Sequence, residues 1–229
     1  MIVASRTNIV FKPFVRMITL KVLRSIVRYK NFIMFWRFFT AVLLLPLALQ
    51  AQSMDDSGFT FFDQPKPMPA IEWLDNAGNI KTLDDYLGSV VLINLWATWC
   101  APCVQEMPAL ERTQERFGLL GLKIIPINVE ELPIGQLVNF YNRLGLETLN
   151  IHQDPSQRVM LKLNADSLPA SFLFTRTGKW LGGLSGVPHW DGGPTQKALH
   201  EVLMQPVSSE DMKEAFTRRN AKDASPTSP

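Results

Sequence analysis

Hydrophobic and polar residues change their spacing near residue 100, and this change separates a predicted strand from a predicted helix. Residues 90–96 are all apolar except Asn94. A continuous apolar run of this length is typical of a strand that is buried on both faces, as the strands of parallel sheets are. From residue 101 onward the apolar residues recur at helical spacing, and Pro102 suits a first helical turn because its missing N–H is not needed there. The pattern therefore predicts a buried strand that ends where a helix begins.

The chain between residues 70 and 205 continues in short segments of strand and helix pattern. Strands are expected at residues 71–74, 79–82, 122–129, 149–154, 170–175 and 179–184. Helices are expected at residues 83–87, 133–144, 156–163 and 195–204. Pro126 lies inside one strand pattern and indicates an edge or bulged pairing at that position. This alternation predicts one α/β domain that spans residues 70–205.

Two segments that flank this region lack a core pattern. Residues 52–69 are polar and then proline-rich, which is typical of a linker. Residues 206–229 are rich in Ser, Pro and charged residues and have few large apolar side chains, so a disordered tail is expected there.

Residues 1–51 indicate a targeting segment. Residues 38–49 form an apolar run that follows basic residues and precedes Ala51, which is typical of a signal peptide. The run is shorter than the roughly 20 residues that span a bilayer, but residues 31–37 extend it toward that length, so a retained membrane anchor is the alternative. Residues 1–33 are either an extension upstream of a start at Met34 or a long basic leader. In each case the domain is expected in the periplasm or on the extracytoplasmic face of the membrane.

Charge is divided unevenly along the chain. The net charge is +2, but eight basic residues and no acidic one precede Asp55. The other 15 basic and 21 acidic residues give the rest of the chain a net charge of −6. Because the domain is acidic, a surface that binds nucleic acid is not expected.

The chain has only two cysteines, Cys100 and Cys103, and the pattern places both at the start of a helix. The free N–H groups and dipole of a helix N-terminus stabilise a thiolate, so Cys100 is the predicted nucleophile. Cys103, one turn along, is predicted to resolve a mixed disulfide. A structural staple is disfavoured because the closed loop is tiny, and zinc would need two more ligands, for which His152, His189 and His200 lack metal spacing. The pair therefore predicts a redox-active disulfide that uses neither metal nor cofactor.

Residues 94–103 read Asn-Leu-Trp-Ala-Thr-Trp-Cys-Ala-Pro-Cys and are followed by Glu106, by Pro108 and, before a later strand, by Leu168-Pro169. This combination resembles the thioredoxin superfamily, and more closely its TlpA/ResA-type branch of periplasmic or membrane-tethered proteins, over about residues 68–205. The resemblance implies a thioredoxin-like α/β fold, in which helices flank a central mixed sheet, with an N-terminal β-hairpin and a central βα insertion. It also implies that Pro169 is a cis proline that faces the cysteines.

The resemblance implies the function of an extracytoplasmic protein thiol–disulfide oxidoreductase, in a branch that includes the reductants of cytochrome c maturation. The expected partners are protein disulfides and a membrane thiol that donates electrons. Contact with the membrane is expected only through an uncleaved N-terminal segment. A disulfide oxidase or isomerase is the alternative among enzymes, and a copper-handling module that uses the same two cysteines is the alternative from another class.

Two polar residues near the cysteines are candidates for proton transfer. Glu106 lies three residues after Cys103 on the same helix face, and the resemblance links a glutamate at this place to acid–base tuning of the pair. The alternative for Glu106 is a solvated surface carboxylate. Asn94 stands where thioredoxin has a buried aspartate, which shifts this task toward Glu106, unless Asn94 only satisfies local hydrogen bonds.

Three further residues are candidates for substrate binding. Trp99 precedes the nucleophile and is expected to contact substrate, with simple packing as the alternative, whereas Trp96 is expected in the core. A cis Pro169 would leave the backbone of Leu168 able to pair with an extended substrate segment. The alternative for Pro169 is a turn proline before a strand.

Overall fold

Strand β4 (Val90–Trp96) is buried along its whole length and has a strand on each side. β5 (Leu122–Asn128) pairs with it in parallel, and β7 (Ala170–Phe174) pairs with it antiparallel. The computed structural model that shows this sheet describes residues 57–224. β4 leads through a short loop into α2 (Ala101–Phe117), so the predicted buried strand and helix are confirmed.

The sheet has eight strands in the order β1-β8-β7-β4-β5-β6-β2-β3. The outer strands are β1 (Thr60–Lys66), β8 (Trp180–Ser185), β6 (His152–Gln153), β2 (Glu72–Asp75) and β3 (Ile80–Thr82). Parallel and antiparallel pairs both occur, which confirms the predicted mixed sheet. The hairpins β2–β3 and β7–β8 form where the turn signals predict them.

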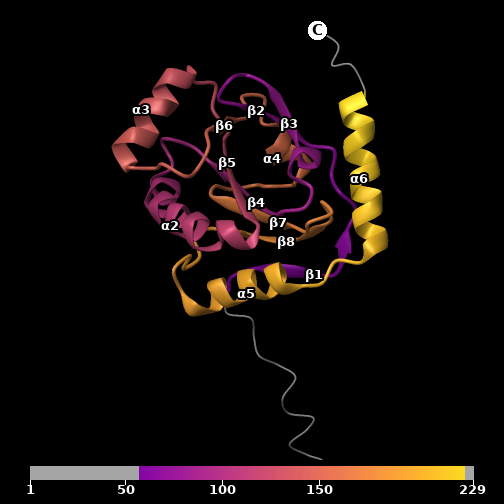
Figure 1. The fold of residues 1–229 in the computed structure, drawn as a ribbon. Coiled ribbons are helices and arrows are strands. Elements are labelled where there is room, and N and C mark those ends of the chain that lie inside the picture. The colour runs from indigo at the N-terminus through magenta and orange to yellow at the C-terminus, as the bar shows by residue number, and fades with distance from the viewer. Residues whose placement is uncertain (1–56, 225–229) are drawn as a thin grey trace, which may run out of the picture. The chain divides into compact units, whose positions relative to one another are not determined.

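Helices cover both faces of the sheet. They are η1 (Leu83–Tyr86), α2, η2 (Gly118–Leu120), α3 (Ile134–Leu144), α4 (Arg158–Lys162), α5 (Gly193–Met204) and α6 (Ser209–Ala224). The crossovers β4–α2–β5 and β5–α3–β6 step in the same direction across the sheet, and right-handed crossovers of this kind put both helices on one face. Figure 1 shows α2 and α3 on one side of the sheet and α4 and α6 on the other.

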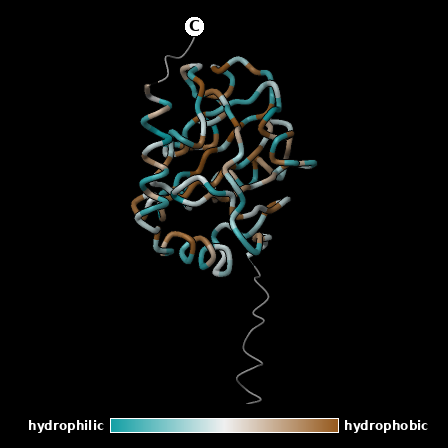
Figure 2. The backbone as a smooth tube through the Cα atoms, turned by 90° about the vertical axis from the view of Figure 1, so that its right-hand side faces the viewer, coloured by the Kyte–Doolittle hydropathy of each residue, from teal (hydrophilic) through white to brown (hydrophobic). Residues whose placement is uncertain are grey.

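The core is centred on β4 and its neighbours. Figure 2 shows hydrophobic stretches of the chain running through the interior of the molecule. Trp96 is fully buried at the end of β4 and packs its ring against Phe140 and Tyr141, with centroid distances of 5.4 and 6.0 Å. The prediction that Trp96 belongs to the core is confirmed.

The prediction of a linker over residues 52–69 is wrong for residues 60–66, which form β1 along one edge of the sheet. β1 pairs antiparallel with β8, and Phe62 lies edge-on to Trp180 at 5.1 Å between ring centroids. Pro65 does not prevent this, because an edge strand needs hydrogen bonds on one side only. The residues before 57 lie outside the described part of the chain.

The prediction of a disordered tail over residues 206–229 is wrong for residues 209–224, which form α6. Ser208 caps this helix, since its Oγ accepts a hydrogen bond from the N–H of Asp211 at 3.0 Å and donates to the Asp211 carboxylate at 2.8 Å. Lys222 binds the carboxylate of Asp85 in η1, and Ala215 is buried. Contacts with the folded domain therefore stabilise a helix in residues 209–224, although their polar composition is typical of a disordered tail. Residues 225–229 lie outside the described part.

Smaller differences concern lengths. β6 and α4 are shorter than the segments expected at 149–154 and 156–163, but they do form the predicted βα insertion. Pro126 pairs with Asn94 of β4 without a bulge, whereas β6 reaches only Ile127 and Asn128 on the other side. Position 126 is thus a local edge, as its proline indicates. The described fold extends over residues 57–224, beyond the predicted domain limits of 70 and 205.

The predicted signal peptide or anchor, residues 1–51, lies outside the described residues. None of the helices between residues 57 and 224 combines the length and hydrophobicity that a membrane span requires.

Candidate active site

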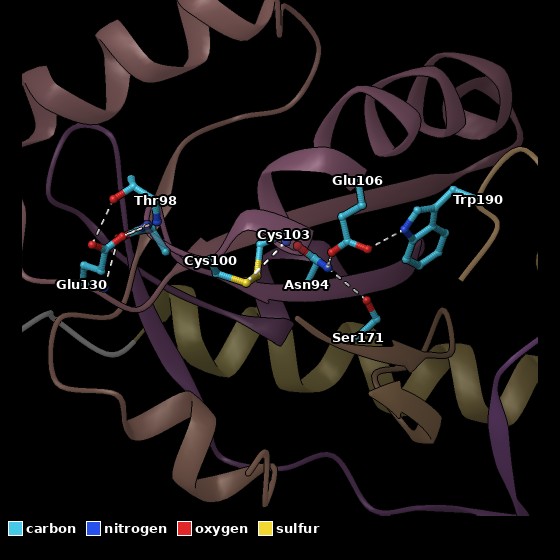
Figure 3. Close-up of a disulfide and its surroundings, with 9 residues drawn as sticks. Asn94, Thr98, Cys100, Cys103, Glu106, Glu130, Ser171 and Trp190 are labelled. Atoms are coloured by element: carbon cyan, nitrogen blue, oxygen red, sulfur yellow. Dashed lines mark hydrogen bonds between the residues drawn. A yellow bond between two sulfur atoms is a disulfide. The ribbon is translucent and has the colours of Figure 1, made fainter. Parts of the chain in front are cut away.

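The two cysteines form a disulfide at the N-terminus of α2 (Figure 3). Cys100 is the N-cap of the helix, and the backbone N–H of Cys103 donates to its Sγ at 3.3 Å. In the reduced protein this N–H and the helix dipole stabilise a thiolate on Cys100. Cys100 is 5% exposed and Cys103 is fully buried, so Cys100 is the more accessible residue of the pair.

The loop between β4 and α2 is fixed by Glu130, which follows β5. The Glu130 carboxylate accepts hydrogen bonds from the backbone N–H and the Oγ1 of Thr98, the latter at 3.0 Å, and from Nδ2 of Asn128 at 3.0 Å. Glu130 was not predicted from the sequence. Its position could have revealed it, because an acidic residue directly after a buried parallel strand lies at the same sheet edge as the cysteines.

Glu106 is buried, with 2% of its surface exposed. Its Oε1 accepts a hydrogen bond from Nδ2 of Asn94 at 2.8 Å, and its Oε2 accepts one from Nε1 of Trp190 at 2.9 Å. Burial raises the pKa of Glu106 to about 7, and the two hydrogen bonds oppose part of that rise. A solvated surface carboxylate, the alternative for this residue, does not fit this environment.

Asn94 links Glu106 to strand β7. Its Nδ2 also donates to Oγ of Ser171 at 3.1 Å, while its buried Oδ1 has no hydrogen-bond partner among the described residues. Ser171 and Trp190 were not predicted from the sequence, and they lie 77 and 84 residues from their partners. Ser171 gave a weak signal as a polar residue in an apolar strand, and Trp190 gave none.

The bond between Leu168 and Pro169 is cis, as the resemblance implies. Ala170, the next residue, pairs with Leu95 near the end of β4, so Pro169 lies at the sheet edge where the cysteine loop begins. Trp99 is 71% exposed beside Cys100, whereas Leu168 is half-buried against the core. The predicted substrate residues thus gather at one edge of the sheet, and their roles stay predictions.

The histidines do not gather with the cysteines. His152 is buried in β6, where its Nε2 lies 3.3 Å from the hydroxyl of Tyr86, and burial lowers its pKa to about 4. His189 and His200 are exposed. Within residues 57–224, no group of three or more His, Cys, Asp or Glu side chains is placed to hold a metal ion.

Comparisons with known proteins agree with this geometry. Residues 65–179 match the model of the AhpC/TSA family. The chain is 32% identical over 143 residues to the thiol-disulfide oxidoreductase ResA of Geobacillus kaustophilus, which covers 61% of this chain and 81% of the relative. It is 30% identical over 129 residues to the protein of the same name from Bacillus subtilis, which covers 56% and 68%.

A solved structure from Chlorobium tepidum, described as a thiol:disulfide interchange protein DsbE, matches with a TM-score of 0.55 and 25% identity. The match covers 62% of this chain and 99% of that one. The residues that match the family model contain β4, the cysteine pair and the cis proline.

Proposed function

The chain belongs to the AhpC/TSA family and is a thiol–disulfide oxidoreductase, and from this premise we propose that it reduces disulfides of client proteins outside the cytoplasm. One observation carries the proposal: a cysteine pair at a helix N-terminus lies one helical turn from a buried carboxyl group. The helix terminus favours attack by Cys100, and the carboxyl of Glu106 is able to take up a proton.

Reduction proceeds in two exchanges. The Cys100 thiolate attacks one sulfur of the client disulfide, forming a mixed disulfide, and the other client sulfur leaves as a thiolate and is protonated. Cys103 then loses its proton and attacks Sγ of Cys100, which forms the Cys100–Cys103 disulfide and releases the second client thiol. The client gains two electrons and two protons; the protein gives up the two electrons and the proton of Cys103, and solvent supplies the second proton.

Glu106 takes the proton from Cys103 in the second exchange. The two residues are one turn apart on the same face of α2. Figure 3 shows that the Glu106 carboxyl points toward Asn94, near the N-terminus of this helix. A carboxyl group whose pKa is near 7 accepts and returns a proton at neutral pH with little cost in either direction.

The client binds across the edge formed by Trp99 and the cis proline. An extended client segment pairs with the backbone of Leu168 beside Pro169, as a peptide adds to a strand end. The exposed indole of Trp99 packs against apolar client side chains next to Cys100.

The pattern of residues 1–51 supports the proposed location and, through it, the proposed electron source. A signal peptide or anchor within residues 1–51 delivers the domain to the periplasm or to the extracytoplasmic face of the membrane. Thiols oxidise there unless they are kept reduced, so a membrane thiol donor supplies the electrons. Apocytochrome c is one client class that fits the resemblance to ResA.

The test is to express full-length Cys103→Ser, which is expected to stall as mixed disulfides on Cys100, and to identify the trapped clients by mass spectrometry. Cys100→Ser is the matched control and is expected to trap none. Trapping by Cys100→Ser but not by Cys103→Ser would reverse the roles of the two cysteines.

The direction of the reaction is tested by equilibrating the wild-type protein with glutathione buffers. The expected potential is closer to that of thioredoxin, about −270 mV, than to that of DsbA, about −120 mV. A value near that of DsbA would contradict a reductant and favour an oxidase.

A further inference from the structure

Glu106 has a fixed partner on the side opposite Asn94. The indole of Trp190, which lies in the loop between β8 and α5, donates to Oε2, so the carboxyl group is held between an amide and an indole (Figure 3). Trp190 is buried and lies edge-on to Phe59 at 6.2 Å between ring centroids. Packing therefore fixes the direction of its N–H.

A cleft of about 390 Å³ borders this hydrogen bond. It lies between α2 and the loop of residues 187–192, and its lining includes Gln105, Glu106, Ala109, Val187, His189 and Trp190. Gln105, Val187 and His189 are exposed, so the cleft opens to solvent. Water in the cleft therefore comes close to a carboxyl group that is otherwise enclosed.

Few charged groups face Glu106. β4 contributes the uncharged Asn94, and Ser171 of β7 is hydrogen-bonded to that amide. The loop contributes His189 and Asp191 to the cleft, and Asp191 is paired with Arg112 of α2 at 2.6 Å. Since Asp191 is held in that ion pair, His189 is the group of the cleft lining to control for in a pH profile.

We propose that Trp190 is a positioning residue that fixes Oε2 of Glu106 at the wall of this cleft, and that the cleft is the path by which Glu106 exchanges its proton with water. The inference rests on the proposed acid–base function of Glu106. The proton lost by Cys103 passes to the carboxylate, then to water in the cleft, and the departing client thiolate takes up a proton from the same solvent. Glu106 thereby returns to its ionised form. The two electrons pass from the cysteine sulfurs to the client sulfurs and do not involve Glu106.

Trp190→Phe keeps an aromatic ring and removes the N–H. Because that N–H stabilises the ionised carboxylate, its loss is expected to raise the titration midpoint of Glu106 by about one pH unit. The midpoint is measured by infrared titration of the full-length oxidised protein, and the Glu106 band is identified by its loss in Glu106→Gln. Trp73→Phe is the matched control, since Trp73 is also buried but its Nε1 has no partner among the described residues.

An unchanged midpoint in Trp190→Phe, or an equal shift in Trp73→Phe, would overturn the positioning role. The pH–rate profile for reduction of oxidised glutathione gives the second readout. Trp190→Phe is expected to shift this profile to higher pH, as it shifts the Glu106 midpoint. The same shift is expected in a His189→Gln background, and no shift is expected in a Glu106→Gln background. An equal slowing by Trp190→Phe with and without Glu106 would show that Trp190 acts on the fold alone, and would also overturn the role.

The two proposals fail in different ways. If Glu106→Gln leaves the pH–rate profile unchanged while Trp190→Phe still moves the infrared midpoint, the acid–base function is wrong and the positioning holds. If Glu106→Gln changes the profile and Trp190→Phe moves neither readout, the positioning is wrong and the acid–base function holds.

The proton path is tested by filling the cleft. Val187→Phe places a ring at its mouth and is expected to slow turnover several-fold without moving the Glu106 midpoint, and the slowing should vanish in a Glu106→Gln background. Val138→Phe is the matched control, because Val138 is similarly exposed but lies on α3, outside the cleft. Turnover of Val187→Phe at the wild-type rate would overturn the cleft as the path.

Discussion

Glu106 has an amide and an indole as its hydrogen-bond partners, and neither carries a charge that favours the carboxylate. Burial raises its pKa to about 7 from 4.5, so the folded protein holds this proton more tightly than the unfolded chain. The stability that comes from the protonated form is complete below about pH 4.5 and is lost as pH rises through 7.

Glu106→Gln is therefore expected to raise the free energy of unfolding at pH 8 by about 3 kcal/mol and to change it little at pH 4. The measurement is denaturant unfolding of the oxidised protein at both pH values. A variant that gains no more stability at pH 8 than at pH 4 would contradict the raised pKa.

His152 shows the opposite behaviour. Burial lowers its pKa to about 4 from 6.5, so the folded state favours the neutral imidazole. Its contribution is complete above about pH 6.5 and is lost as pH falls through 4. In the wild type this loss is expected to reach about 3 kcal/mol, and it should disappear in His152→Gln. The exposed His200 provides the control, since His200→Gln should leave the pH dependence of unfolding in place.

At the residue scale, sequence predicts a contact only where spacing along one element determines it. Cys100, Cys103 and Glu106 lie within two turns of one helix, so their common face follows from helical geometry. Trp190 meets Glu106 across 84 residues, and such a contact depends on the strand order and on the path of a loop. The hydrophobic pattern does not specify that path.

At the element scale, the central strands and helices were predictable because the spacing of apolar residues within each segment indicates its secondary structure. The two ends of the domain were not predictable, because β1 and α6 form through contacts with distant parts of the chain. β1 forms where β8 accepts it: a Cβ at Gly182 would lie 2.2 Å from the backbone oxygen of Thr60, so only glycine allows this approach. The glycine pair at residues 182–183 was the available signal of a close backbone neighbour.

The C-terminal helix α6 is expected to stabilise the domain through its contacts with η1. Partial burial would raise the pKa of Asp85, but hydrogen bonds from Lys222 and from the backbone of Thr82 outweigh it, and the pKa is lowered. The ion pair is partly exposed, so Lys222→Ala is expected to cost at most about 1 kcal/mol of stability. Truncation after Gln205 should cost more, because it also removes the buried Ala215 and the bond from Arg219 to the backbone of Asp85.

Denaturant unfolding of the two variants and of Lys213→Ala tests this. Lys213 is an exposed lysine on the same helix, and its replacement should change stability little. Equal stability of the truncated and full-length proteins would show that α6 adds nothing to the fold.

At the scale of the whole molecule, Glu106 and His152 have opposite effects on how stability depends on pH. Between about pH 4.5 and 6.5, rising pH weakens the contribution of Glu106 and strengthens that of His152. The single variants Glu106→Gln and His152→Gln should therefore show slopes of stability against pH with opposite signs relative to the wild type. The double variant should match the wild-type slope, and a double variant that follows either single variant would contradict this balance.

The strand order also determines when the sheet can be completed during synthesis of the chain. β1 is made first but pairs with β8, some 120 residues later, and Lys222 reaches back 137 residues to Asp85. A growing chain therefore keeps an aromatic-rich edge strand without its partner until nearly all of the domain has left the ribosome. During that interval β1 is open to pairing with other chains, so a folding helper that shields extended segments should raise the yield of this protein more than that of a domain whose first strands pair with each other.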